Sequence, residues 1–557
     1  MEGINTKNLV ILIIVMLFII SLSINVISTE ETKTIYVDDD DCADYTYIQD
    51  AIDAAKPGDT VFVYNGSYVE NIKIDVSIDL VGESKENTII DGNNDGDVVF
   101  VSADEVIICG FTINHREGSS NDAGIRLNSD SNIIIGNNIK HNDEGIFIND
   151  SSYNIIENNN IEKNRYGIWL SSSSENNVLF SNTINNNFNG IWLDDSSDNN
   201  TINENKIIDN TYDGIMLYDS SDNIICRNTI MDNARIGIET GYDLSYNNTI
   251  NNNKIADSIT LRRPLNYTIT HNTLCGEGLY LTGEKISYWN THTIFNNTID
   301  SRPIRFYKNM RNIDVPHDAV QVILANCSHF TIQNLTLSNI NIGVQLGFSS
   351  NNVIKQNIIT SNTVNGLYLF NSTKNIIEGN TILTNKRSGI RISNSSQNVI
   401  KENNIEGNDY GIVLESSSDN KIIRSKFKGN HWSGIVLDTA SNENTIYNNQ
   451  IMESGDRSVL IIHSSGNLIG ENNFIDNQLN PLIYRIYRNY VRDLIDIFHN
   501  TFNKWEKNYW NDWPGGIPRP IELRLNIVDT EEYPIISFPW LLFDWHPAEN
   551  PYDIDVN

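Results

Sequence analysis

Cysteine is scarce in this chain. The 557 residues include five cysteines, which are odd in number, widely scattered and without any C-x-x-C spacing: Cys42, Cys109, Cys226, Cys275 and Cys327. Such a set indicates neither a disulfide framework nor a thiolate metal site. Cys109 and Cys226 are interpreted as buried small apolar residues, and a Cys275–Cys327 disulfide stays open as an alternative.

Positive charge is also in short supply. Lys and Arg number 39 against 71 Asp and Glu, which gives a formal net charge of −32. This balance argues against a protein that wraps nucleic acid or lies on an anionic membrane. It favours solubility, cation binding or a salty medium, and it does not choose among them.

Long apolar runs are absent except near the N-terminus, where residues Leu9 to Ile27 follow Lys7. This run predicts an export signal over residues 1–28, cleaved after Ser28. The alternative is an uncleaved anchor, because the run is nearly long enough to span a bilayer. Either interpretation places the rest of the chain outside the cytoplasm.

Neither the LxxLxLxxN pattern of leucine-rich repeats nor an apolar helical stripe occurs along the chain. A different unit repeats instead, and its clearest copy runs from Asn189 to Asn210. In an extended segment Ile191 and Leu193 point one way and Trp192 points the other. Two shorter strands follow, each bounded by polar corners.

The copies recur every 21 to 24 residues. The anchor is Gly-Ile/Leu/Val-x-apolar, with the glycine at Gly124, Gly145, Gly167, Gly190, Gly214, Gly237, Gly343, Gly366, Gly389, Gly411 and Gly434. One asparagine series keeps the same phase at Asn132, Asn154, Asn177, Asn200, Asn223, Asn248, Asn352, Asn375, Asn398, Asn420, Asn444 and Asn467. Another lies at Asn142, Asn164, Asn187, Asn210, Asn233, Asn362, Asn385, Asn408, Asn430 and Asn477.

These periods predict an all-β fold, a right-handed parallel β-helix with three short strands and about 22–23 residues per coil. Stacked coils would lie roughly 4.8 Å apart. Asparagine suits the corners because it tolerates a left-handed backbone and its amide can bond to copies above and below.

Six segments follow from the composition. A helix over Tyr47–Ala55 is expected to cover the first coil, and the Trp- and Pro-rich tail is expected to form an irregular cap on the last coil. The segments are a signal peptide or anchor (1–28), a cap with irregular coils (29–122), regular coils (123–255), interrupted coils with long loops (256–320), regular coils (321–478) and the capping tail (479–557).

The sequence resembles the NosD-like β-helix proteins, also called carbohydrate-binding and sugar-hydrolase (CASH) repeats. The resemblance rests on the repeat Gly167–Asn187, the segment Gln321–Cys327 and the closing Asn508–Trp513 motif. It implies the fold, whereas the function stays open, because this fold hosts lyases, hydrolases, epimerases and non-catalytic surface proteins. The founding NosD acts in copper-site maturation, but the six methionines and ten histidines here form no cluster with ligand spacing.

The best surface candidate is a row of outward residues in successive coils: Phe147, Trp169, Trp192 and Met216. Sugar rings stack on aromatic faces, so this stripe predicts a polysaccharide-binding surface. The alternative is that the tail or a neighbouring molecule covers it.

Carboxylates gather at the next corner, and they suggest two further hypotheses. Asp194, Asp195 and Asp219 could bind calcium, which takes oxygen ligands, although solvated turn residues are the simpler interpretation. The same three could form the acid pair of a glycosidase, roughly 5–9.5 Å apart. His317, in Asp314–Asp318, is a candidate base for an epimerase or lyase.

These observations favour an exported, non-catalytic protein that binds carbohydrate or has a structural role at the cell surface. The expected partner is an extracellular or cell-wall polysaccharide, with no nucleic acid, and with a membrane only if residues 9–27 stay uncleaved. No cofactor is predicted, and calcium is the candidate metal. The alternatives are a polysaccharide lyase, epimerase or hydrolase, and an accessory factor for copper-site maturation.

Overall fold

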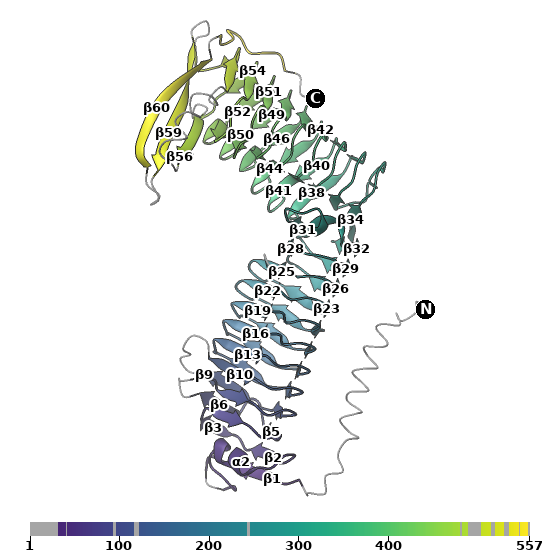
Figure 1. Cartoon of the computed structure of the whole chain (residues 1–557), viewed down its shortest axis with the longest axis vertical. Helices are drawn as coiled ribbons and strands as arrows, with labels where there is room; N and C mark the ends of the chain where they lie inside the picture. Colours follow the sequence, from purple (N-terminus) through teal and green to yellow (C-terminus); the bar gives the residue numbers. More distant parts are fainter. Residues whose placement is uncertain are drawn as a thin grey trace.

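The computed structural model describes residues 32–40, 42–92, 96–115, 122–241, 245–478, 482–487, 503–513, 518–528, 534–544 and 546–554. The predicted signal peptide or anchor, residues 1–28, lies outside them. The fold is the predicted parallel β-solenoid, with about 19 turns. Figure 1 shows it as two stacks of coils that meet at a bend.

The first strands of the coils form one sheet in each stack, and both sheets lie on the inner side of the bend (Figure 1). The N-terminal inner sheet contains β4 (Ile72–Ile74), β7 (Val99–Val101), β10 (Ala123–Leu127), β13 (Glu144–Asn149), β16 (Tyr166–Ser171), β19 (Asn189–Leu193), β22 (Asp213–Leu217), β25 (Ile236–Thr240), β28 (Ile259–Arg262) and β31 (Leu279–Thr282). The C-terminal inner sheet contains β34 (Arg302–Lys308), β35 (Gln321–Ala325), β38 (Ile342–Gly347), β41 (Asn365–Phe370), β44 (Ser388–Ser393), β47 (Tyr410–Glu415), β50 (Ser433–Asp438), β53 (Arg457–Ile462), β56 (Leu482–Tyr487), β59 (Arg519–Val528) and β60 (Pro534–Asp544).

The second strands form two more sheets. In the N-terminal stack they are β1 (Thr34–Val37), β2 (Thr60–Val63), β5 (Asp79–Gly82), β8 (Ile107–Cys109), β11 (Ile133–Ile135), β14 (Ile155–Glu157), β17 (Val178–Phe180), β20 (Thr201–Asn203), β23 (Ile224–Cys226), β26 (Thr249–Asn251), β29 (Thr268–Thr270) and β32 (Thr293–Phe295). In the C-terminal stack they are β36 (Thr331–Gln333), β39 (Val353–Lys355), β42 (Ile376–Glu378), β45 (Val399–Lys401), β48 (Lys421–Ile423), β51 (Thr445–Tyr447), β54 (Leu468–Gly470) and β57 (Lys504–Glu506).

The third strands close each coil. In the N-terminal stack they are β3 (Gly66–Val69), β6 (Thr88–Gly92), β9 (Thr112–His115), β12 (Asn138–Lys140), β15 (Asn160–Glu162), β18 (Thr183–Asn185), β21 (Lys206–Ile208), β24 (Thr229–Met231), β27 (Lys254–Ile255), β30 (Thr273–Leu274) and β33 (Thr298–Ile299). In the C-terminal stack they are β37 (Thr336–Ser338), β40 (Ile358–Thr360), β43 (Thr381–Leu383), β46 (Asn404–Glu406), β49 (Lys426–Lys428), β52 (Gln450–Met452), β55 (Asn473–Ile475) and β58 (Tyr509–Trp510).

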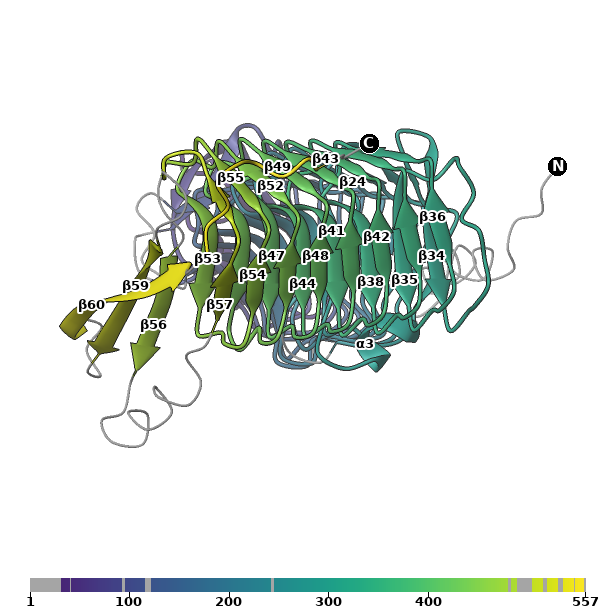
Figure 2. The ribbon, with the colours of Figure 1, turned by 90° about the horizontal axis from the view of Figure 1, so that it is seen from above.

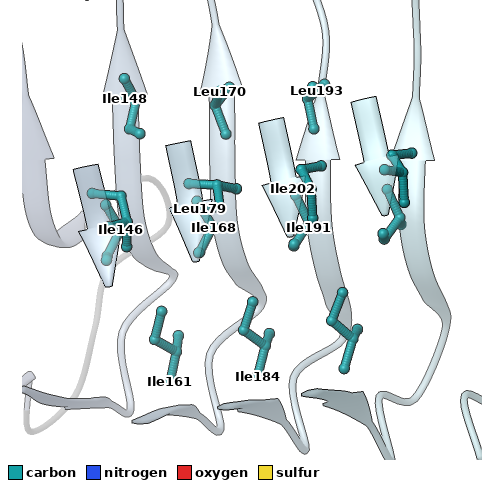
Figure 3. Close-up of a cluster of buried hydrophobic side chains, with 14 of the residues drawn as sticks. Ile146, Ile148, Ile161, Ile168, Leu170, Leu179, Ile184, Ile191, Leu193 and Ile202 are labelled. Atoms are coloured by element: carbon teal, nitrogen blue, oxygen red, sulfur yellow. The ribbon is translucent and has the colours of Figure 1, made fainter. Parts of the chain in front are cut away.

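The core is a column of aliphatic side chains that each coil extends. In the coil of β19, β20 and β21 the inward residues Ile191, Leu193, Ile202 and Ile207 are fully buried. Figure 3 shows such side chains stacked from coil to coil. Complete burial of one of them contributes roughly 2 kcal/mol, so a coil is stable only with neighbours on which to stack.

Asparagine ladders close the corners, as predicted, but the backbone explanation was wrong. Asn132 donates from both its backbone N and its Nδ2 to Oδ1 of Asn154 in the next coil, at 2.9 and 3.0 Å. The left-handed residue is the one before each ladder asparagine, for example Ser131 (φ 61°) before Asn132 and Asn199 (φ 58°) before Asn200. The ladder asparagine therefore acts through its buried side-chain amide, which forms hydrogen bonds with backbone groups at the corner.

A further ladder at the second corner was not predicted. Asn137, Asn159, Asn182 and Asn205 repeat the same bonding, and Asn182 donates from Nδ2 to Asn205 Oδ1 at 3.0 Å. The series extends to Asn297 in the first stack and recurs at Asn357 in the second.

The anchor glycine is required by packing. A Cβ on Gly190 would lie 2.4 Å from the carbonyl oxygen of Gly214 and 2.8 Å from Ile207 Cγ2. The backbones of successive coils approach too closely at this position for any side chain.

A short helix, α2 (Ile48–Ala54), lies at the N-terminal end of the solenoid (Figure 1), within the predicted Tyr47–Ala55. It packs against β1, β2 and β4 and buries Ile48, Ala51 and Ile52. The helix thus covers the apolar end of the first coil, as terminal units of repeat proteins must.

The two stacks meet at the interruption predicted between residues 256 and 320. β33 pairs antiparallel with β34, which begins the C-terminal inner sheet. Among the described strands none pairs with the outer edge of β31. The side chain of Gln321 covers this edge, because its Oε1 accepts from Leu279 N and its Nε2 donates to Leu279 O, both at 2.9 Å.

Other side chains complete this junction. Gln345 Oε1 accepts from Leu281 N at 3.2 Å, next to the Gln321 contact. Helix α3 (Ser287–Asn290) carries Trp289, which is fully buried against Gly347. His292, also fully buried, accepts from Tyr267 N at Nδ1 and faces the Tyr288 carbonyl with Nε2. Burial lowers the pKa of His292 to about 4, so the imidazole is neutral.

The tail predicted to be an irregular cap contains a regular hairpin. β59 and β60 pair antiparallel and extend the C-terminal inner sheet through β56. Figure 2 shows this hairpin projecting beside the stack. Asp544 Oδ2 accepts from the backbone N and Nδ2 of Asn508, at 3.0 and 3.1 Å, and so ends the second-corner ladder.

The five cysteines, all within the described part of the chain, form no disulfide with one another, so the Cys275–Cys327 bond is absent. Cys109 and Cys226, expected to be buried, are half-buried on outward positions, and Cys327 is the buried one. In the described part of the chain no helix has the length and apolarity needed to cross a membrane.

Candidate functional site

The outward row of the N-terminal inner sheet is the predicted aromatic stripe. Strand pairing places Phe147 beside Trp169, Trp169 beside Trp192, and Trp192 beside Met216. Arg126 and Glu239 occupy the same row at its two ends. The alternation of side chains therefore predicted both the direction and the register of these residues correctly.

The rings pack on one another and do not form a flat platform. The centroids of Phe147 and Trp169 lie 4.7 Å apart with stacked planes, and those of Trp169 and Trp192 lie 6.0 Å apart at 31°. The Arg126 guanidinium lies 4.4 Å from the Phe147 centroid and leaves that ring only 9% exposed. Both indoles stay half-buried, so each presents part of a ring to a ligand.

A second row, one position before the anchor glycines, adjoins the stripe and was missed in the sequence. It comprises Glu144, Tyr166, Asn189 and Asp213. Tyr166 contacts the stripe directly, with ring centroids 5.1 Å from Trp169 and 4.9 Å from Trp192. The sequence did contain a signal for this row, because Glu144 and Asp213 each directly precede an anchor glycine of the repeat.

Both carboxyl groups of this second row are buried and bind protons more tightly than usual. Glu144 is 1% exposed, and burial raises its pKa to about 7 although the Arg126 guanidinium opposes the shift. Asp213 is fully buried, and burial raises its pKa to about 6 against the effect of Arg235. Near neutral pH these groups therefore exist in both protonation states.

The arginines of this surface are engaged by carboxylates. Arg126 Nε lies 2.5 Å from Asp97 Oδ2, and Arg262 Nε lies 2.5 Å from Glu239 Oε1. Arg235 pairs with both Asp213 and Glu239. These cations mainly offset charge within the protein.

The aspartates predicted to form a calcium site or an acid pair have separate surroundings. Asp194 Oδ1 accepts from Trp169 Nε1 at 3.0 Å, and burial raises the pKa of Asp194. Asp195 and Asp219 are exposed turn residues with φ of 47° and 45°. Among the described residues no three His, Cys, Asp or Glu side chains converge as metal ligands would.

His317 lies apart from these aspartates. It is an exposed turn residue at the junction, and its Nδ1 lies 3.2 Å from the Gln333 carbonyl on β36. The aspartates belong to coils of the N-terminal stack, so the candidate acid pair and the candidate base His317 are separate sites.

The C-terminal inner sheet carries a shallow open pocket of about 310 Å³. Tyr368 and Phe370 form one side of it, and Arg391 contacts both carboxylate oxygens of Glu415 at 2.8 Å. Phe370 in turn stacks on the buried Trp289 at 6.1 Å. The pocket thus belongs to the junction between the stacks.

Two family models match the chain. Residues 24–258 match NosD, described as a periplasmic copper-binding protein, and residues 320–475 match the right-handed beta helix region. The chain is a NosD-like right-handed β-helix repeat protein. A search of curated proteins gives no match.

Solved structures match the chain at low identity and low TM-score. XylC in complex with xylose is 11% identical with a TM-score of 0.37, over 54% of this chain and 76% of that one. A mutant DFA-IIIase from Arthrobacter chlorophenolicus A6 is 10% identical with a TM-score of 0.35, over 63% and 95%. Pectate lyase Pel9A is 13% identical with a TM-score of 0.25, over 62% and 79%.

The copper of the NosD description has no fitting donor set in the described part of this NosD-like chain. His317 is exposed, and its Nδ1 faces a backbone carbonyl. Both ring nitrogens of His292 contact backbone groups of the junction. Cys327 Sγ contacts two backbone carbonyls in a buried position. With no converging His, Cys, Asp or Glu trio there, these residues do not suit copper.

Proposed function

We propose that this NosD-like protein works outside the cytoplasm as a glycan-binding protein, and that the outer face of its N-terminal inner sheet binds the glycan. The observation that carries the proposal is the in-register row of Phe147, Trp169 and Trp192. Aromatic faces take up the apolar faces of sugar rings. The described part of the tail packs near the last coils, as Tyr552 does on Asn473, so it leaves this row accessible.

The arrangement of the buried carboxyl groups favours binding over hydrolysis. These groups are Glu144, Asp213 and Glu239. Asp213 and Glu239 both pair with Arg235, so their charge is offset within the protein. Three coil steps separate Glu144 from Asp213, which is about 14 Å at roughly 4.8 Å per step, whereas paired carboxylates of glycosidases lie about 5–9.5 Å apart.

A glycan array on the purified protein tests the proposal. We expect retention of intact polysaccharide, and Trp169→Ala/Trp192→Ala should weaken it at least tenfold, since aromatic anchors dominate such interfaces. Phe180→Ala is the matched control, because Phe180 is a half-buried outward aromatic on β17, in the same coil as Trp169. Equal retention by both variants would contradict the proposal.

Mass analysis of the recovered glycan separates binding from catalysis. Unchanged polymer agrees with a binding protein. Shortened chains, unsaturated ends or epimerised sugars would instead make the protein a hydrolase, lyase or epimerase on the same fold.

A further inference from the structure

Three polar atoms on the outer face of the N-terminal inner sheet lack hydrogen-bond partners although they are buried. They are Glu144 Oε2, Trp192 Nε1 and Asp213 Oδ1. Glu144 is 1% exposed and Asp213 is fully buried. Glu144 Oε2 lies 3.7 Å from Arg126 Nη2, an ion pair without a hydrogen bond. A buried polar atom without a hydrogen bond costs on the order of 1–3 kcal/mol, so three in one surface indicate partners that arrive with a ligand.

The three atoms belong to one continuous surface. The Glu144 and Asp213 carboxyl groups begin β13 and β22, with Tyr166 and Asn189 between them in the same row. Trp192 lies in the adjacent aromatic row and touches Tyr166. The surface therefore crosses four successive coils along the solenoid axis, a length of about 14 Å, which exceeds a single sugar ring.

The chemistry of the unpaired atoms defines what the ligand must offer. Two are carboxyl oxygens, which only accept hydrogen bonds in the ionised form that prevails at pH 8, and one is an indole N–H, which only donates. A sugar hydroxyl can donate to the carboxylates and accept from the indole. A carboxylate on the ligand could only accept, so it would suit Trp192 alone.

The charge of the surface also favours an uncharged ligand over an anionic one. Its cations are Arg126, Arg165, Arg235 and Arg262, and each is paired with at least one carboxylate. Its carboxylates are more numerous: Asp97, Asp143, Glu144, Asp194, Asp213 and Glu239. At pH 8, where Glu144 and Asp213 are largely ionised, an anionic ligand would therefore meet net negative charge in a partly desolvated site.

We propose that this surface selects an uncharged, hydroxyl-bearing oligosaccharide, laid along the solenoid axis from Glu144 to Asp213, and rejects polyuronates. The selection rests on the proposed glycan-binding function and specifies its ligand class. Trp169 and Trp192 supply the stacking surface, while Glu144 and Asp213 accept hydroxyl hydrogen bonds at the two ends.

Titration calorimetry with matched oligosaccharides tests the selection. Mannose, galactose and glucose oligomers are each paired with the uronate oligomer of the same linkage and length, so the members differ only in CH2OH against COO⁻ at C6. We expect the best neutral ligand to bind at least tenfold more tightly than its uronate partner at pH 8. A uronate that binds as tightly as its neutral partner overturns the selection, and so does a glucosamine oligomer that binds tenfold more tightly than the glucose one.

A double variant and a control test whether Glu144 and Asp213 are responsible for the preference for neutral ligands. Glu144→Gln/Asp213→Asn keeps acceptor oxygens but removes negative charge beside Arg126 and Arg235, so the neutral-to-uronate preference should fall at least tenfold. Glu162→Gln, on β15 of the same coil, is the matched control and should change nothing. A folded double variant with unchanged preference contradicts our assignment, and the wild-type pairs decide the matter if that variant does not fold.

The two proposals fail in different ways. If no glycan of either kind binds, or if Trp169→Ala/Trp192→Ala has no effect, the glycan-binding function is wrong. If neutral and uronate ligands both bind and both need the tryptophans, the function stands and only the selection is wrong.

Discussion

The two stacks are alike inside and different outside. Inward positions carry the same residues, for example Ile168 and Leu170 in β16 and Ile390 and Ile392 in β44, all fully buried. The corresponding outward row changes from Trp169 and Trp192 in the first stack to Val413, Val436 and Leu460 in the second. Interior positions must match from coil to coil because each coil stacks on the next, whereas outward positions are free to differ. The outward row is therefore where a site can be built without cost to the fold.

The largest loss of stability is expected from a substitution at the junction between the two stacks. Gln321→Leu should lower the free energy of unfolding by about 4 kcal/mol, because it leaves Leu279 N and Ile342 O without their partner and Leu279 O with Gln345 as its remaining donor. Hydrogen exchange should accelerate most at β31. Gln333→Leu, outward on β36, is the control and should change stability little; equal losses for both would show that the amide does not hold the stacks together.

The shared interior predicts equal losses in both stacks. Asn205→Ala and Asn380→Ala each remove an amide that donates to a carbonyl and to the next asparagine, and each should cost about 3 kcal/mol in urea unfolding. Glu204→Gly should cost little, since Glu204 is exposed to solvent at one side of the corner with φ of 58°. A large difference between the two asparagine variants would contradict the expectation that the ladders stabilise both stacks equally.

Acid should act on the junction before it acts on the regular coils. Burial lowers the pKa of His292 to about 4, so the folded state binds fewer protons than the unfolded state as pH falls from about 6.5 to 4. Stability should be complete above that window and fall by up to about 3 kcal/mol across it. Unfolding measured against pH should flatten in His292→Gln and stay unchanged in His431→Gln, an exposed control. A pH profile unaltered by His292→Gln would contradict the assignment.

The carboxyl row should give the first stack an opposite pH response of similar size. Burial raises the pKa of Glu144 to about 7, so the folded state holds its proton more tightly than the unfolded chain, and stability falls as pH rises from about 4.5 to 7. Glu144→Gln should remove a loss on the order of 3 kcal/mol. The same row in the second stack carries Asn365, Ser388 and Tyr410 and should lack this response; hydrogen exchange in each stack at pH 5 and pH 8 measures the contrast.

The parts predicted from the sequence are those that a strict period determines. A side-chain period of two and a coil of constant length decided which residues point inward and which outward, and so located Trp169 and Trp192. The same regularity located the first- and third-corner asparagine ladders. It also carried the second-corner series, in which Asn182 and Asn205 stand 23 residues apart, but that signal went unrecognised.

The features that the sequence did not predict depend on contacts between segments far apart in the chain. Gln321 stood out as part of a family motif, yet its role appears only once β31 and β35 lie side by side. Glu144 was missed because the strand departs from simple alternation at the anchor glycine, where register passes from Glu144 to Ile146.

The asparagine ladders have an electrical polarity. Along a ladder, Nδ2 of one asparagine donates to Oδ1 of the asparagine in the next coil and also to a carbonyl of the preceding coil, so the amide-to-amide bonds run head to tail toward the C-terminus. Asp257 in the first stack and Asp544 in the second accept from the last amide, which places a negative charge at the positive end of each row. A carboxylate has no hydrogen to pass on, so each of these two ladders ends at its aspartate, while the second-corner ladder of the first stack continues to Asn297.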